Sequence, residues 1–147
     1  MAVQRLPRSE HETFEEHREL FEAVDYIRRM LAGGAASRGI ILHILRDLRK
    51  MLLEHFQHEE AEGYFAETAR VAPHLTEHVE RLLAEHQEME NLLTALIAGP
   101  QSQAAIGPWW RSVDNQYSHF VSLFLSHEAA ENRLLQDLYN EDLGDGD

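Results

Sequence analysis

Cysteine is absent from this chain of 147 residues. Disulfide bonds, zinc sites with thiolate ligands and cysteine-bound iron–sulfur clusters are therefore excluded. The first residues, MAVQRLPRSEHE, lack the apolar segment of a secretory signal, and no uninterrupted apolar run approaches membrane-spanning length. We therefore expect a cytoplasmic protein that does not enter a membrane.

Positive charge is also scarce. Lys and Arg number 13 against 26 Asp and Glu, which gives a formal net charge of −13. Nucleic acids and anionic membranes are bound through clustered positive charge, and no basic stripe is present. The acidity is typical of a well-solvated helical surface, and it does not identify a protein partner.

Glycine and proline number only 8 and 4, and they cluster at a few places. Ser9-Glu10-His11-Glu12 resembles a capping box, and Gly33-Gly34, Pro73 and the segment 99–108 mark turns. The sequence therefore predicts helices over about 10–33, 40–70, 74–98 and 109–140. We expect one domain over 1–147, with its core at about 10–140 and a frayed acidic tail at 144–147.

The apolar residues of each predicted helix recur at alternating spacings of three and four. This spacing predicts an all-α fold, an antiparallel up-down-up-down four-helix bundle. In the first helix the expected buried positions are Phe14, His17, Phe21, Val24 and Leu31, with Leu20 and Ile27 beside them. Tyr117 is expected in the core, and Trp109-Trp110 are expected to pack the start of the last helix onto the bundle.

Six polar residues occupy positions that this spacing reserves for the core. The motif His-x-x-x-Glu occurs twice, a Glu-His pair precedes each copy, and the second set follows the first by 69 to 72 residues. The six residues are His17, His55, Glu59, His86, His127 and Glu131. No Lys or Arg shares these faces, and a buried carboxylate is costly unless it is paired or metal-bound. The pattern therefore predicts a metal site at one level of the bundle.

Two carboxylates and four imidazoles favour a site for two metal ions. A His and a Glu four residues apart share one helix face, so the His can bind one ion while the Glu bridges to another. Iron suits these ligands, and manganese or zinc can substitute, whereas magnesium and calcium prefer oxygen ligands. The Glu-x-x-His motif of ferritin-like di-iron bundles is absent.

Four segments carry a resemblance to a known family: EEHREL at 15–20, HFQHEEAEGYF at 55–65, AEHQEM at 84–89 and HEAAENRLL at 127–135. From Glu10 to Tyr139 the chain resembles the hemerythrin-like proteins, or HHE cation-binding domains. The resemblance implies a non-haem di-iron centre with an oxo or hydroxo bridge. It also implies that the four histidines are terminal ligands and that Glu59 and Glu131 are bridging ligands.

The oxygen-carrying members of that family have a fifth histidine, which this chain lacks. The positions one turn from His86 are Leu82 and Glu90. The ligand set instead resembles a bacterial branch written H-HxxxE-H-HxxxE. Water, Glu90 or Tyr64 are the candidates for the remaining position, although regular helix geometry turns Tyr64 away from Glu59.

Three further residues are predicted to lie near the site without ligating a metal. Glu16 and Glu85 point about 100° away from the histidines that follow them. This favours contact with a metal-binding side chain on the side away from the metal, or contact with solvent. His58 flanks the buried face of its helix, where it either supports the site or lies at the surface, with ligation as the less favoured alternative.

The missing histidine argues against simple reversible oxygen carriage. One hypothesis is a di-iron protein that binds or reacts with dioxygen or peroxide, including catalase-like disproportionation of peroxide. The alternative is a module that senses iron, oxygen or nitric oxide, or that buffers iron, without turnover. The sequence leaves the choice between enzyme and binding module open.

Overall fold

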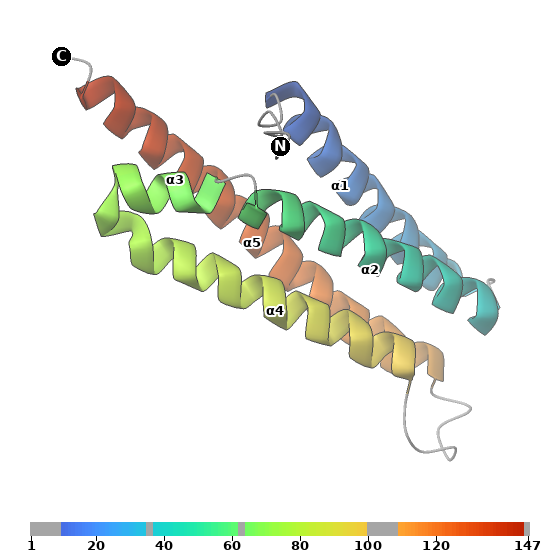
Figure 1. The fold of residues 1–147 in the computed structure, drawn as a ribbon. Coiled ribbons are helices and arrows are strands. Elements are labelled where there is room, and N and C mark those ends of the chain that lie inside the picture. Colours follow the sequence, from blue (N-terminus) through green and yellow to red (C-terminus); the bar gives the residue numbers. More distant parts are fainter. Residues whose placement is uncertain (1–9, 35–36, 62–63, 100–108, 146–147) are drawn as a thin grey trace, which may run out of the picture.

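The computed structural model describes residues 10–34, 37–61, 64–99 and 109–145, and throughout these ranges the regular structure is helical (Figure 1). The elements are α1 (Glu10–Gly33), α2 (Arg38–Ala61), α3 (Tyr64–Val71), the short 3-10 helix η1 (Pro73–Leu75), α4 (Thr76–Ala98) and α5 (Trp109–Asp145). Ser9 and the loop 100–108, on which the sequence placed a cap and a turn, lie outside these ranges.

The four long helices pack as a bundle, as the sequence predicted. Helix α1 contacts α2 and α5, and α4 contacts the same two helices. In Figure 1, successive long helices run in opposite directions along the bundle. Gly34 and Gly99 follow α1 and α4 with φ angles of 63° and 76°, a left-handed conformation that glycine adopts without steric cost.

The helix predicted over 40–70 is two helices, so that prediction was wrong. Helix α2 ends at Ala61 and α3 begins at Tyr64. In one continuous helix Phe65 would point about 120° away from Glu59, because successive residues turn by about 100°. As part of a separate helix, Phe65 is buried against Val79, Leu82 and Leu134. At the other end of the chain, α5 continues past the expected end near residue 140 to Asp145, while residues 146–147 lie outside the described ranges.

The buried face of α1 also differs from the prediction. Leu20 and Ile27 are fully buried, whereas Phe21 is 40% exposed. The stripe that continues from His17 is Leu20, Val24, Ile27 and Leu31. Phe21 lies at the edge of this stripe, where its ring meets Phe124 edge-on at 5.2 Å between centroids. The side chain of Phe14 lies outside the described part of the chain.

Apolar side chains form two clusters along the bundle axis. The larger unites all four long helices and includes Leu52, Met89 and Phe124. The smaller consists of Phe65, Val79, Leu82 and Leu134. On α4, His86 falls between Leu82 and Met89, and on α5 the predicted polar residues fall between Phe124 and Leu134. A polar layer therefore lies between two apolar clusters.

The aromatic residues at the far end of the bundle are placed as predicted where the structure describes them. Tyr117 is buried, and its hydroxyl donates a hydrogen bond of 2.6 Å to the carbonyl oxygen of Val24, which joins α5 to α1. Trp109 is buried at the start of α5, and the guanidinium of Arg38 lies 5.1 Å from its ring centroid. The side chain of Trp110 is outside the described part. No helix of the described ranges is long and apolar enough to cross a membrane.

The Tyr117 hydroxyl tests the contact between α1 and α5. We expect Tyr117→Phe to lower the free energy of unfolding by about 1 kcal/mol, the net value of one buried hydrogen bond. Urea unfolding of the metal-free protein measures this change. Tyr26→Phe is the matched control, because Tyr26 is 49% exposed and its variant should unfold like the wild type. Equal stability of the two variants would contradict the prediction.

Candidate metal centre

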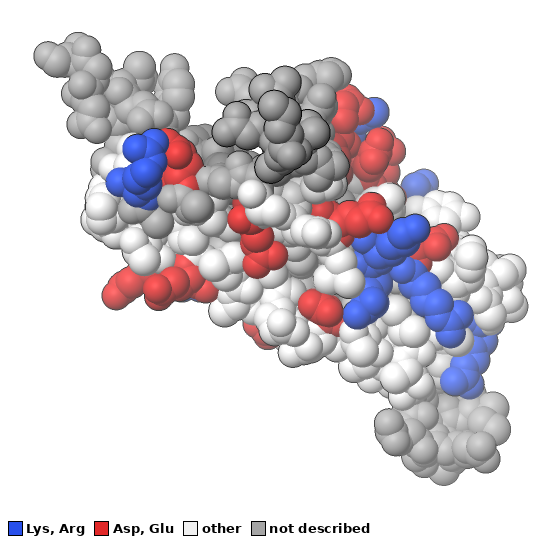
Figure 2. Space-filling model, viewed as in Figure 1, with Lys and Arg blue, Asp and Glu red and all other residues white. Residues whose placement is uncertain are grey.

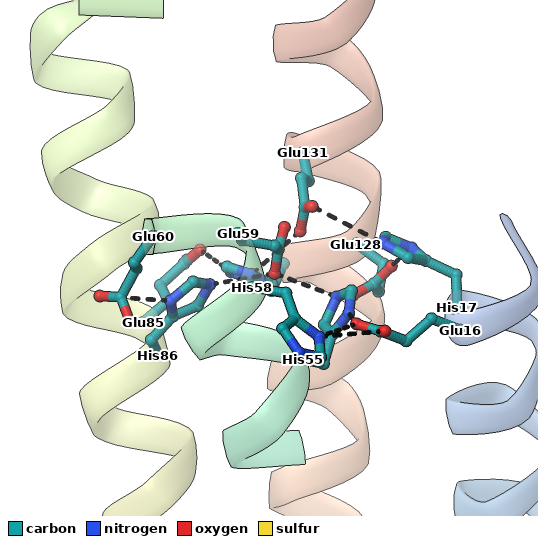
Figure 3. Close-up of polar contacts among 11 residues, drawn as sticks. Glu16, His17, His55, His58, Glu59, Glu60, Glu85, His86, Glu128 and Glu131 are labelled. Atoms are coloured by element: carbon teal, nitrogen blue, oxygen red, sulfur yellow. Dashed lines mark hydrogen bonds and ion pairs between the residues drawn. The ribbon is translucent and has the colours of Figure 1, made fainter. Parts of the chain in front are cut away.

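The six polar residues predicted from the sequence meet in the layer between the two apolar clusters (Figure 3). Helix α1 supplies His17, α2 supplies His55 and Glu59, α4 supplies His86, and α5 supplies the remaining pair, His127 and Glu131. Five of them are buried, and the side chain of His17 is 16% exposed. Each stands where the three-and-four spacing of its helix faces the core, so the fold brings all six together.

The Nε2 atoms of the four histidines point at the two central carboxylates. On Glu59, Oε1 lies 3.0 Å from Nε2 of His55 and 3.6 Å from Nε2 of His86. On Glu131, one oxygen lies 3.3 Å from Nε2 of His127 and the other lies 3.8 Å from Nε2 of His17. Each carboxylate therefore faces imidazoles from two different helices.

Donor atoms gather into three overlapping groups, within each of which they lie within 4.8 Å of one another. The groups are His17, His55, Glu59 and Glu131; Glu59, His86 and His127; and His127, Glu128 and Glu131. Ligand atoms about 2.0–2.2 Å from one ion necessarily lie within about 4.4 Å of each other, so the spacing is close to that of bound ligands. Glu59 and Glu131 each belong to two groups, as a carboxylate between two ions would.

Three of the histidines are held from outside by a carboxylate on another helix. Nδ1 of His55 donates to Glu16, and Nδ1 of His127 donates to Glu85 at 3.0 Å. Nδ1 of His17 lies 2.7 Å from Glu128. Such a contact fixes the tautomer and the ring orientation, so that Nε2 points inward, and it raises the basicity of that nitrogen. Glu16 and Glu85 thus contact histidines of the candidate centre from outside, one of the two roles that the sequence left open.

Glu128 belongs to the candidate centre but was not predicted from the sequence. It is 3% exposed and belongs to one of the three donor groups. Its position four residues after Phe124 and three before Glu131 is a signal that was available, because both neighbours were assigned to the buried face. The adjacent His127 belongs to a His-x-x-x-Glu motif, and this motif identifies His127 and Glu131 but not Glu128.

His86 differs from the other three histidines. Its ring stacks on Phe56 with centroids 3.7 Å apart and planes 10° apart, and its Nδ1 lies 4.0 Å from Glu60, beyond hydrogen-bond distance. Burial, together with the charges of His127 and His55, lowers the pKa of His86 to about 3. By contrast, burial alone would lower the pKa of His55, but the carboxylates of Glu16 and Glu59 outweigh it and raise that pKa to about 9.

Unpaired donor atoms test whether these residues fit a metal. Within the described part of the chain, the Nε2 atoms of all four histidines, both oxygens of Glu59 and one oxygen of Glu131 are buried without a hydrogen-bond partner. Close contacts such as that between His55 and Glu59 lack hydrogen-bond geometry. Buried polar atoms are rarely left unpaired, and buried carboxylates need a compensating positive charge. Nitrogen and carboxylate donors converging without partners therefore fit cations of the transition series.

The additional near-site candidates are placed differently. The carboxylate of Glu90 lies 3.3 Å from Arg49, and Nδ1 of His58 lies 3.2 Å from Glu16. Neither residue belongs to a donor group of the described residues. His58 therefore contacts Glu16, which in turn contacts His55. The side chain of Tyr64 lies outside the described part of the chain, so its role as a ligand stays a prediction.

Comparison with known families agrees with this geometry. The sequence model of the hemerythrin HHE cation binding domain matches residues 10–139. No curated protein and no solved structure matches the chain. The matched range begins with α1 and includes every residue of the three donor groups.

The contact between Glu128 and His17 yields a prediction for metal affinity. We expect Glu128→Gln to weaken metal binding by about tenfold or more, because the amide is a poorer acceptor for Nδ1 of His17. Competition of the metal-free protein with a coloured chelator for zinc measures the change. Glu88→Gln, at an exposed position of α4, removes the same charge and should bind zinc like the wild type. Equal affinities of all three proteins would contradict a role for Glu128.

Proposed function

The chain belongs to the hemerythrin HHE cation-binding family, and from this premise we propose that it is a non-haem di-iron protein that binds or reacts with dioxygen or peroxide. The family and the convergence of His and Glu side chains support metal binding in general. The number of ions, their identity and their chemistry belong to the proposal.

One observation carries the proposal of two ions, namely the position of Glu59. Its carboxylate lies between the group that contains His17 and His55 and the group that contains His86 and His127. A single ion would use one of these groups and leave buried imidazoles of the other without a partner. Two ions, held with Glu59 and Glu131 as shared ligands, would give every inward-facing nitrogen a metal to bind.

Iron is the metal that we propose, with manganese or zinc as substitutes. Imidazole and carboxylate ligands suit all three metals, whereas magnesium and calcium prefer shells of oxygen. Zinc and manganese can fill the same donor set, so loading experiments must compare metals. The proposal of iron rests on the family premise and on this ligand chemistry together.

The residues around the centre orient its ligands and limit access of water. Glu16, Glu85 and Glu128 hold three imidazole rings so that Nε2 faces inward, and Phe56 holds the fourth by stacking. The apolar clusters on both sides exclude bulk water. When bound, two irons supply a shared two-electron change for a small ligand such as dioxygen, peroxide or nitric oxide.

Metal stoichiometry tests the proposal directly. We expect two irons per chain after anaerobic loading with iron(II) and exposure to air, with absorption bands of an oxygen-bridged iron pair. Glu59→Gln should reduce the iron content to about one per chain or less, because an amide is a poor bridge between two cations. Glu54→Gln, at an exposed position of the same helix, should load like the wild type. One iron per wild-type chain would overturn the di-iron proposal.

Turnover of peroxide is a separate expectation. We expect the iron-loaded protein to evolve oxygen from hydrogen peroxide faster than the same amount of free iron. An oxygen electrode measures the rate, and the metal-free protein is the control. Two bound irons without oxygen evolution above free iron would contradict catalase-like activity. If metal also raised the melting temperature strongly, that outcome would favour the sensing or buffering function.

A further inference from the structure

A groove of about 330 Å³ lies between α2 and α4, beside the metal centre but outside its donor groups. His86 and Phe56 form part of its lining, and the polar side chains Gln57, Glu60 and Gln87 surround its mouth. Figure 3 shows Glu60 and His86 together on one flank of the site, on the side opposite His17. The groove therefore connects the surface with one ligand of the centre.

His86 is the ligand that joins the groove to the centre. Its ring is nine-tenths buried or more, its Nδ1 has no hydrogen-bond partner among the residues that the structure describes, and it lines the groove. Nδ1 lies 4.0 Å from Glu60, while Nε2 of the same ring lies 3.6 Å from Glu59. In the other three histidines Nδ1 already contacts a carboxylate. Among the four, only His86 offers a nitrogen to an ion outside the centre.

Charge in the groove favours a cation. Glu60 has no Lys or Arg partner among the described residues, and its side chain is 48% exposed, so it can move. The second carboxylate of the groove, Glu90, is already paired with Arg49. In the view of Figure 2, most basic side chains lie toward the end of the bundle where α2 begins, while acidic side chains are spread over the middle and the opposite end. A cation approaching the centre therefore meets the carboxylate of Glu60, while the nearby Arg49 is paired with Glu90.

We propose that iron(II) first binds in this groove, between the carboxylate of Glu60 and Nδ1 of His86, on its way into the centre. The inference rests on the proposed function, because it concerns how that centre is loaded. A carboxylate and an imidazole are suitable ligands, and an ion about 2.0–2.2 Å from each spans a separation of about 4 Å. The ion then passes to Glu59, which lies on the inner side of His86, near Nε2 of that ring.

The rate of iron uptake tests the groove without reference to catalysis. Metal-free protein is mixed anaerobically with iron(II), and uptake is followed by the disappearance of chelatable iron. We expect Glu60→Gln to load about tenfold more slowly than the wild type, because the local attraction for cations and one entry ligand are lost. The final iron content should be unchanged, since Glu60 belongs to none of the donor groups. Glu54→Gln removes the same charge from an exposed position of α2 and should load at the wild-type rate.

A second variant tests the groove by adding charge. We expect Gln87→Lys to slow uptake as well, because Gln87 lines the groove and a lysine there repels iron(II). Gln136→Lys, at an exposed position of α5, is its control and should load normally. Circular dichroism and the melting temperature of the metal-free variants establish that each one folds.

The outcomes separate this inference from the proposed function. Slow loading of Glu60→Gln and Gln87→Lys to the full iron content supports the groove. Wild-type rates for both variants, with two irons bound, overturn the groove and leave the di-iron proposal standing. A wild-type protein that binds no iron overturns both.

Discussion

Two carboxylates buried among four imidazoles are the constraint on which the rest of this structure depends. Glu59 and Glu131 lie in the middle of a helical bundle, between two apolar clusters, and no Lys or Arg of the described residues pairs with them. Burying such groups costs free energy unless a cation or a hydrogen bond compensates. The surrounding contacts follow from this cost, because each imidazole must turn Nε2 toward the carboxylates. A hydrogen bond to Nδ1 or stacking on Phe56 achieves this.

The fold and the inner residues of the centre could be predicted from the sequence because they follow local rules. Turn residues and the three-and-four spacing predicted the four-helix bundle, and the repeated motif identified the six side chains that the structure brings together. The features that were missed depend on how neighbouring helices pack. After the break between α2 and α3, Phe65 packs with Val79 and Leu82 of α4. On α1, Leu20 rather than Phe21 is buried.

The internal repeat does not make the two halves of the centre equivalent. Phe56 and Glu128 are 72 residues apart, as His55 and His127 are, so they occupy matching positions in the two halves. In one half this position supplies a carboxylate to His17, and in the other it supplies an aromatic face to His86. A carboxylate raises the basicity of the imidazole that it contacts, whereas stacking orients the ring without doing so. Under the proposed function, His86 is therefore the histidine expected to hold a metal least firmly.

The two halves also differ at the surface, in the groove that His86 lines. The fifth histidine is missing one turn from this same residue. The residue that matches Glu60 in the second half is Asn132, so the carboxylate that lines the groove between α2 and α4 has no acidic counterpart at the matching position. The second donor group, with His86 and His127, has one carboxylate, whereas the group of His17 and His55 has two. The side of the centre that contains His86 has fewer donors, a less basic imidazole and the open groove. Under the proposed function, exchange of metal or of a small ligand would meet the least resistance there, because fewer strong contacts must break. On the opposite side of the centre, the carboxylate-supported His17 and His55 would hold an ion more firmly during that exchange.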